Sequence, residues 1–316
     1  MPIEVSVLAD SLNVATKRRL TSFLLRYPRF IHSEVMTHRV FERNSASSRA
    51  IPTAKLLAEV LRDPAMPVRW GKMNRGMQDA GPLPRGTAAV CRALWRLARY
   101  PVVGLVWLML KLGLAKQVAN RLLEPWCWMT VVLTGTEWAN FYRLRAHKDA
   151  QPEICELATQ MLRAHAASEP RPLQPGEWHL PFIRPADELA WAGLPEEVRV
   201  AWSSHAPDDA TRSRRDGTPY FLRLATARCA RVSYVNFYGK DDPAEDAKLH
   251  DRLRASGHHS PFGHSARAES ADAFFANLRG FRPYRNVLGG DTFDGAEPFD
   301  PKALATELGL MTGVSA

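Results

Sequence analysis

The stretch that decides the fold runs from Leu20 to Arg49 and reads LTSFLLRYPRFIHSEVMTHRVFERNSASSR. Its first part, Leu20 to Tyr27, is an apolar run of strand length, and it predicts a buried β-strand. Pro28 suits the first position of a following helix, because its missing N–H costs nothing there. The inner face of that helix would be formed by Phe30, Ile31, Val35 and Met36. The helix leads into a polar segment that starts at Thr37.

The polar segment reads THRVFERNSASSR and sets arginines and a histidine among serines and an asparagine. Arginine and serine together supply charge-assisted donors for phosphate oxygens. The alternative is a polar turn in front of the helix that we expect after Pro52. The residues alone leave both interpretations open. The apolar side of the helix after Pro52 would consist of Leu56, Leu57, Val60 and Leu61.

A second cluster reads TGTEWANFYRLRAHKDAQPEI and runs from Thr134 to Ile154. Thr136 is expected to cap a helix there. That helix would contain Trp138, Phe141 and Leu144, and Trp138 and Phe141, one turn apart, would form its aromatic face. Asn140 and Arg145 lie beside this apolar face, where they either meet water or present themselves to a ligand. A further helix is expected after Pro152, with Ile154, Leu157 and Met161 buried.

A third cluster combines RCARVSY, residues 228–234, with GHHSPFGH, residues 257–264. Between them, Asp242 can cap a helix that Pro243 begins and Gly257 ends. Three histidines in the second motif raise the question of a metal. No cysteine accompanies them, and a catalytic zinc site normally needs three well-placed ligands. We therefore expect these histidines to make hydrogen bonds, and we predict no metal.

Composition limits the function classes only broadly. The chain has 316 residues, 46% of them hydrophobic and 24% charged, which is an ordinary globular balance. Its net charge is +9, and a basic surface favours anionic partners or simply solubility. No helix-turn-helix, zinc or aromatic-platform motif supports nucleic-acid binding, so that reading is unfavoured. No Gly-rich phosphate loop or dinucleotide fingerprint appears either.

The four cysteines form no Cys-x-x-Cys pair, and the start MPIEVSVLAD lacks a secretory pattern. We therefore expect a cytoplasmic protein. No cysteine sits beside a basic histidine, so no thiolate nucleophile is indicated. The most apolar stretch, Pro101 to Leu114, is interrupted by Lys111 and is short for a membrane span. We interpret it as a buried or interface helix and predict no membrane partner.

The chain is expected to form one domain from two parts. Residues 1–167 would supply the first two clusters, and residues 220–290 would supply the third. The proline-rich segment 168–219 would be a connecting segment or an insertion, and residues 291–316 a tail. Within that connecting segment, Arg212, Arg214 and Arg215 fit a solvated loop better than a phosphate site.

Taken together, the clusters resemble the flavin-dependent thymidylate synthase family in four motifs. Its Arg-His-Arg, Asn-Glu and Ser-x-Arg elements read here Thr37-His38-Arg39, Asn44-Ser45 and Ser47-Ser48-Arg49. Its Asn-Phe-x-x-Leu-Arg and Ala-Gln-x-Glu-Ile elements correspond to residues 140–145 and 150–154. Its Ala-Arg-Val-Ser-Tyr is Ala230–Tyr234, and its Gly-His-x-Ser/Thr-Pro-Phe-Glu-His is Gly257–His264.

The order of these motifs differs from the usual one. In the family, the Arg-Val-Ser and Ser-Pro-Phe segments precede the His-Arg segment, and here they follow it. The arrangement resembles a circular permutation, which folds tolerate when the old termini lie close together. We associate this layout with phage-borne relatives.

The resemblance implies an α+β fold with a largely antiparallel sheet wrapped by helices, assembled as a homotetramer with sites shared between subunits. It implies conversion of dUMP to dTMP. Methylenetetrahydrofolate would provide the carbon, and FAD reduced by NADPH would provide the hydride. This chemistry requires no enzyme thiol.

The resemblance also implies roles for residues. Arg145 would be the catalytic residue, stabilising the ionised N3 edge of uracil as a preorganised cation. The nucleotide would be held by Glu34, Ser45, Ser47, Arg49, Arg121 and Arg145. The flavin site would be lined by Thr37, His38, Arg39, Asn44, Asn140, Ser233, His258 and Ser260.

Several positions depart from the family pattern. Thr37 replaces an arginine, and Ser45 and Gly263 each replace a glutamate. Glutamates stand where glutamine or serine is usual, at positions 34 and 42. Thr134, Thr136 and Asn120 fall where the family has ligand-binding Asn, Arg and Arg, and compensation would have to come from Arg121, Arg279, Arg282 or Arg285.

These departures keep two other functions open. One is a different flavin- and folate-dependent modification at C5 of a pyrimidine nucleotide, such as hydroxymethylation. The other is a catalytically silent homologue that binds nucleotides.

Overall fold

The central element is a five-stranded sheet in the order β3-β4-β2-β1-β5. The structure, a computed structural model, describes residues 3–75, 81–204, 206–208, 211, 216–289 and 306. The strands are β1 Glu4–Asn13, β2 Arg19–Pro28, β3 Glu42–Ser45, β4 Trp128–Gly135 and β5 Arg171–Leu173. All neighbours are antiparallel except β1 and β5, which are parallel. The predicted α+β class with a largely antiparallel sheet is confirmed.

The strand predicted at Leu20 to Tyr27 is confirmed as β2, and its side chains alternate between two buried faces. Phe23, Leu25 and Tyr27 belong to the main hydrophobic core, whereas Leu24 packs on the opposite face. Burial on both faces explains why the run is apolar without alternation.

The helix predicted from Pro28 is wrong in its extent. Pro28 is the last residue of β2, where it pairs with Trp128. Only a short turn follows, as η1 Arg29–Ile31 and α1 His32–Val35. Ile31 and Val35 are buried as expected, but Met36 is exposed, because the helix has already ended there.

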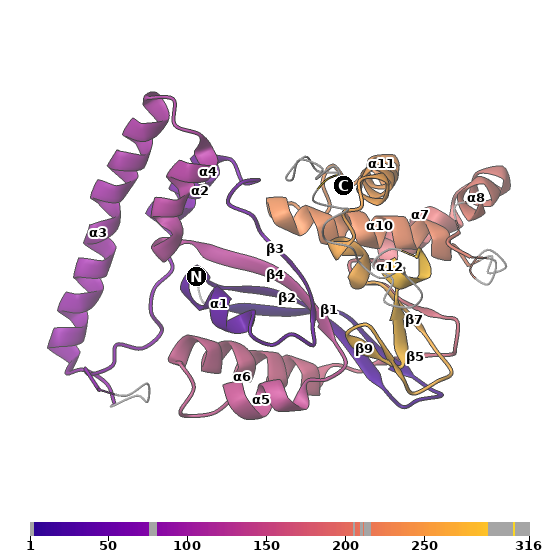
Figure 1. Ribbon diagram of the computed structural model, residues 1–316, viewed down its shortest axis with the longest axis horizontal. Coiled ribbons are helices and arrows are strands. Elements are labelled where there is room, and N and C mark those ends of the chain that lie inside the picture. The colour runs from indigo at the N-terminus through magenta and orange to yellow at the C-terminus, as the bar shows by residue number, and fades with distance from the viewer. Residues whose placement is uncertain are drawn as a thin grey trace, which may run out of the picture.

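Helices cover both faces of the sheet (Figure 1). On one face, α6 Pro152–Ala167 packs on β1 and β2, with α5 Ala139–Arg145 beside it. On the other face, α10 Thr218–Arg231 and η3 Val232–Tyr234 bring Cys229 and Val232 against Val132. The predicted burial of Ile154, Leu157 and Met161 in α6 is confirmed.

The cap predicted at Thr136 is wrong. The N-cap of α5 is Trp138, and the Thr136 hydroxyl instead accepts a hydrogen bond from the backbone N–H of Arg279 at 3.1 Å. Trp138 and Phe141 are buried as expected, but Leu144 is exposed. The helix begins two residues later than the sequence indicated.

The segment predicted as a connecting segment or insertion contributes to both larger sheets. It supplies β5 to the main sheet and β6 Trp178–His179 to a three-stranded sheet in the order β10-β7-β6. The other strands are β7 Ala266–Ala268, β10 Phe281–Pro283, and the hairpin of β8 Phe274–Phe275 with β9 Leu278–Arg279. It also carries α7 Pro185–Ala192 and α8 Glu196–Ser203. Arg212, Arg214, Arg215 and nearly all of the predicted tail lie outside the described residues.

The remaining helices frame the two ends of the molecule. Near the third cluster lie α11 Pro243–Ala255, η4 Ser260–Gly263 and α12 Tyr284–Val287. Asp242 caps α11 as predicted, accepting from the N–H of Ala244 at 2.8 Å. At the other end lie α2 Thr53–Arg62, α3 Arg85–Lys111, α4 Lys116–Ala119 and η2 Asn120–Trp126.

The long helix α3 stands apart from the sheet and packs on α2, α4 and η2 (Figure 1). It runs through Pro101, so most of the apolar stretch Pro101 to Leu114 forms the second half of a longer helix. By length and composition α3 is apolar enough to cross a membrane. Only 11% of its most apolar window is buried within the chain. Large apolar side chains on it are exposed, among them Val90, Leu94, Leu97, Leu105, Trp107 and Leu108.

Candidate functional site

The edge strand β3 is where distant motifs meet. One side of β3 pairs with β4, and the other side contacts η3 and η4. The Asn44 side chain donates to the carbonyl of Cys229 at 2.5 Å, and the Ser260 hydroxyl donates to the carbonyl of Arg43 at 3.1 Å. The N–H of Ser47 donates to the carbonyl of Ser233 at 3.0 Å. The His-Arg, Arg-Val-Ser and Ser-Pro-Phe segments therefore form one continuous surface.

A second set of contacts joins the Asn-Phe-x-x-Leu-Arg helix to the same surface. Arg145 on α5 donates through Nε to Nε2 of His38 at 3.0 Å, and it forms an ion pair with Glu34. Its Nη2 lies 3.5 Å from the Thr37 hydroxyl. The ring of His38 is held edge-on to Phe141, with centroids 4.9 Å apart. Residues 107 positions apart thus build one polar cluster.

The charge state of His38 fits this arrangement. Burial, and then the neighbouring charge of Arg145, lower the pKa of His38 below its usual value. A neutral imidazole can accept the hydrogen bond from Arg145, which a protonated ring cannot do. Arg43 adds a further link, because its Nη1 donates to the carbonyls of Met36 and His38 at 2.8 and 3.2 Å.

The predicted phosphate residues lie in the turn that follows β3. The side chain of Asn120 at the start of η2 donates to the carbonyl of Ser48 at 2.8 Å. This bond brings Arg121, the next residue, close to the turn that carries Ser47 and Arg49. Arg49 and Arg121 are exposed, and neither side chain forms a hydrogen bond or ion pair with the part of the chain that the structure describes. Within the described chain, two guanidinium groups are therefore left unpaired near the Ser47 hydroxyl.

Not all predicted site residues are joined to this surface. Arg39, Asn140 and His258 are exposed, and their side chains make no contact with the cluster within the described ranges. Three cavities in the described chain are lined by other residues, the largest of them between β1, β5 and α7 with a volume of about 630 Å³. The candidate site of a single chain is thus an open surface.

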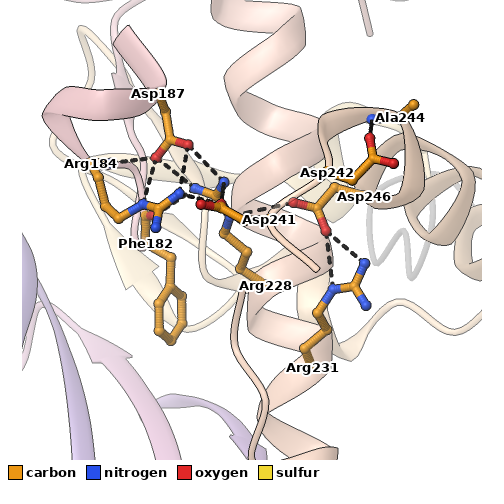
Figure 2. A network of polar contacts seen from close by, with 9 residues as sticks. All are labelled: Phe182, Arg184, Asp187, Arg228, Arg231, Asp241, Asp242, Ala244 and Asp246. Atoms are coloured by element: carbon orange, nitrogen blue, oxygen red, sulfur yellow. Dashed lines mark hydrogen bonds and ion pairs between the residues drawn. The ribbon is translucent and has the colours of Figure 1, made fainter. Parts of the chain in front are cut away.

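A buried ion-pair network links the Arg-Val-Ser segment and the helix α10 that leads into it to α7 and α11 (Figure 2). Both terminal nitrogens of Arg228 donate to the carboxylate of Asp187 at 2.7 Å. Arg231 donates to Asp246 at 2.8 and 3.0 Å. Burial would raise the pKa of Asp187, but hydrogen bonds from Arg228 and Arg184 hold it below its usual range. Asp246, which is fully buried, has a raised pKa because burial outweighs its arginine partners.

A second buried network joins two motif residues, Thr134 and His264, to residues outside the motifs. His179 of β6 bonds to the hydroxyls of Ser11 and Ser22 at 2.9 and 2.8 Å. Ser22 contacts Thr134 at 2.6 Å, and Thr134 contacts His264 at 2.9 Å. Thr134, where the family has an asparagine, is thus a buried structural link. The only sequence signal is that small hydroxyl residues interrupt apolar strands.

The three motif histidines occupy different environments. His264 is fully buried, and burial lowers its pKa to about 3. His259 packs edge-on against Phe262, and His258 is exposed. Within the described residues, no three His, Cys, Asp or Glu side chains gather as a metal site.

Three arginines were considered as replacements for lost ligand contacts. Arg279 pairs with Asp272, Arg282 with Glu269, and Arg285 with Glu42. Each guanidinium already has a carboxylate partner within the chain, so the structure does not support this compensation. Among the predicted site residues, Arg49, Arg121 and Arg39 are exposed and have no such partner in the described chain.

The thiols of two cysteines are far from ionised at neutral pH. Burial raises the pKa of Cys127 to about 12, and burial raises the pKa of Cys229 as well. Cys127 lies in the main core.

The α+β fold thus gathers an arginine, a neutral histidine and several hydroxyls at one strand edge, and such groups can form hydrogen bonds with a polar, anionic ligand. Residues 20–171 match the family described as thymidylate synthase complementing protein. Over these residues the match confirms the resemblance drawn from the motifs. The match includes the first two motifs and ends before the other two.

Similar backbones are found among solved structures. Two are of a UMP/dUMP methylase PolB from Streptomyces cacaoi, one bound with 5-Br UMP and one with 5-Br dUMP. They share 18% and 19% identity with this chain, with TM-scores of 0.42 and 0.41. Each covers 52% of this chain and 88% or 90% of its own. A likeness of this degree concerns the course of half the backbone and does not extend to ligands. No curated protein sequence matches the chain.

Proposed function

We propose that the protein is a flavin-dependent thymidylate synthase that methylates dUMP at C5 to give dTMP. The family match supports the coarser statement, C5 methylation of a pyrimidine nucleotide. The observation that carries the proposal is the contact of Arg145 with neutral His38, next to the strand edge where the other motifs meet. This geometry holds a cation beside hydrogen-bonding groups without the help of a thiol.

In the proposed reaction, methylenetetrahydrofolate provides the one-carbon unit. FAD, reduced by NADPH, supplies the hydride that completes the methyl group. The chain's own task is to bind and orient the nucleotide and to stabilise negative charge on the uracil ring. Arg145 fits that task because two partners, His38 and Glu34, fix its guanidinium plane.

The nucleotide would lie between Arg145 and the turn after β3. Arg49, Arg121 and the Ser47 hydroxyl would hold its phosphate, since exposed guanidinium groups bind phosphate with charge-assisted, bidentate hydrogen bonds. Ser45 and Glu34 would flank the base and sugar. The carboxylate of Glu34 would not bind phosphate, so we place it at the Arg145 end.

The residues present also fit a flavin dinucleotide. Its diphosphate needs unpaired donors, and the exposed Arg39 has no partner in the described chain. His38, Thr37 and Asn140 would lie on one side of the flavin, with Asn44, Ser233, His258 and Ser260 on the other. One N–H of the Asn44 side chain is already engaged by the carbonyl of Cys229, so Asn44 would offer its oxygen and its second N–H.

We further propose that the active enzyme is a homotetramer whose sites are completed by neighbouring subunits. The candidate site is an open surface in one chain, and Arg39 and His258 are exposed without contacting its polar cluster. The exposed apolar side chains of α3 provide an interface of the kind a permanent oligomer needs.

The test begins with an absorbance spectrum of the purified protein, alone and after incubation with FAD. The flavin is then reduced with NADPH, and its oxidation is followed after addition of dUMP and methylenetetrahydrofolate. We expect bound flavin, oxidation that depends on dUMP, and a product heavier than dUMP by one methylene group.

A matched pair of variants locates the chemistry. Arg145→Ala should slow dUMP-dependent flavin oxidation by about 100-fold or more, the usual effect of losing a preorganised donor. Arg143→Ala, on the exposed side of the same helix, should leave the rate unchanged. Equal rates for both variants would remove Arg145 from the proposal.

Other outcomes identify the competing functions. A product heavier than dUMP by one CH₂O unit would indicate hydroxymethylation. Nucleotide binding by a colourless protein that takes up no FAD would indicate a silent homologue.

A further inference from the structure

Gly263 and Glu42 share one volume of space. Gly263 is the last residue of η4, and Glu42 is the first residue of β3. A Cβ built on Gly263 would lie 2.8 Å from Cδ of Glu42 and closer still to its Oε2. Real Cβ atoms do not approach other atoms so closely. Any side chain at position 263 therefore excludes the present position of the Glu42 carboxylate.

Both positions are departures from the family pattern. The family motif has glutamate at position 263, where this chain has glycine, and serine is common at position 42, where this chain has glutamate. Taken singly, each substitution reads as the loss or gain of a charge. Taken with the shared volume, the two positions are coupled, because a side chain at position 263 and the present Glu42 carboxylate cannot occupy the same space.

The Glu42 carboxylate has specific partners in that place. It is 3% exposed, and its Oε1 accepts hydrogen bonds from Arg285 at 2.7 Å and from Asn277 at 3.2 Å. Arg285 belongs to α12, and Asn277 connects β8 to β9. The carboxylate thereby fastens the last described segment of the chain to β3.

We propose that Glu42 supplies the carboxylate that the Ser-Pro-Phe motif normally carries at position 263, and that it acts as a positioning residue for the nucleotide and flavin site. It acts through its neighbours. The residue after Glu42 receives the hydrogen bond from Ser260, and the next one binds Cys229. A shift of Glu42 would move both contacts that hold the motifs together at β3.

The test compares four proteins: the natural chain, Glu42→Ser, Gly263→Glu, and the double variant Glu42→Ser/Gly263→Glu. Binding of dUMP is measured by calorimetry, and thermal unfolding is measured on the same samples. We expect each single variant to weaken dUMP binding at least tenfold and to unfold at a lower temperature. The double variant should return dUMP affinity to within about threefold of the natural chain, because coupled neighbours are non-additive.

Rescue is the readout that separates positioning from general loss of structure. If the double variant is as weak as the two single effects combined, the carboxylate is not exchangeable and the proposal fails. It fails equally if Glu42→Ser binds dUMP like the natural chain. The control Glu196→Ser removes an exposed carboxylate on α8 and should change neither measurement.

The binding readout rests on the proposed function, and the unfolding readout does not. If the natural chain binds no dUMP, the proposed function is in error, and the exchange is then judged by unfolding temperature alone. Should Glu42→Ser not fold, Glu42→Gln keeps the side-chain volume and removes the charge. A Gln variant that unfolds like the natural chain would show that the charge is dispensable and would overturn the proposal.

Discussion

Arg228 and Asp187 form a bidentate ion pair, with both distances 2.7 Å, that lies wholly inside the protein. The guanidinium is 1% exposed and the carboxylate 6%. The pair ties α10, which leads into the Arg-Val-Ser motif, to α7 of the segment between the two motif-bearing parts (Figure 2). The position of Ser233 beside β3 therefore depends on a segment that carries no family motif.

Removing one member of this pair should be costly. We expect Arg228→Met to lower the free energy of unfolding by about 3–5 kcal/mol, because it leaves Asp187 buried without its main counter-charge. The double variant Arg228→Met/Asp187→Leu should cost less than the two single changes added together. Urea unfolding measures all three.

The control for this prediction is an exposed pair of the same chemistry. Arg199 and Glu196 lie 3.5 Å apart on α8, and their side chains are 39% and 75% exposed. Arg199→Met should cost less than about 1 kcal/mol. If Arg228→Met and Arg199→Met lower the free energy of unfolding by similar amounts, the buried pair stabilises the fold no more than the exposed pair does.

Sequence patterns predicted the parts of the fold that depend on local periodicity. The β2 strand, the α6 helix with its buried Ile154, and the Asp242 cap were all predictable, because each reflects a spacing or a single hydrogen bond within a few residues. Motif matching likewise indicated that Arg145 and His38 belong to one site.

The remaining features depend on contacts between residues far apart in the chain. The partner of Thr136 is Arg279, 143 residues away, so its role as a cap could not be excluded locally. In the sequence, Glu42 is only a glutamate at a position where the family often has serine. That its carboxylate fills the space beside Gly263 is visible only in the folded chain. No periodic pattern shows that α3 stays largely uncovered by its own chain.

Loss of Arg49 should weaken binding of the phosphate and leave binding of the base unchanged. An exposed guanidinium bound to phosphate contributes a charge-assisted hydrogen bond of about 1.5–3 kcal/mol, so Arg49→Ala should raise the Kd for dUMP roughly 10- to 100-fold. Deoxyuridine, which lacks the phosphate, should bind the variant and the natural chain equally. Arg163→Ala, an exposed arginine on α6, serves as control. If deoxyuridine binding falls as much as dUMP binding, Arg49 does not act on the phosphate.

Acid should destabilise the protein through its buried histidines. Burial lowers the pKa of His179 to about 3, far below its ordinary value of 6.5. His179 in the unfolded chain therefore binds a proton as the pH falls through about 6.5, whereas His179 in the folded chain stays neutral until about pH 3. Stability is complete above that pH and falls as pH decreases toward 3. The same sign holds for His32, His165, His250 and His264, whose pKa values are also lowered.

A histidine variant isolates one proton of this effect. Between about pH 5.5 and 4, His179→Gln should reduce the slope of unfolding free energy against pH by about 1.4 kcal/mol per pH unit. His147→Gln, at an exposed position, should leave the slope unchanged. Urea unfolding at several pH values gives the slopes. An unaltered slope in His179→Gln would show that His179 is not kept neutral by burial.

The exposed face of α3 should hold the oligomer together. Leu97 and Leu105 are 61% and 51% exposed in the single chain, and burying such leucines against another subunit is the main source of interface energy. Light scattering should give four times the chain mass of 35.4 kDa for the natural protein. Leu97→Glu or Leu105→Glu should weaken assembly at least about 30-fold and lower flavin uptake with it, because a hot-spot residue contributes about 2 kcal/mol or more. Leu189→Glu replaces a leucine that is 74% exposed on α7 and should alter neither. The prediction fails if the natural protein has the mass of one chain at micromolar concentration. It also fails if the protein sediments with lipid vesicles through α3, because this face would then bind something other than a second copy.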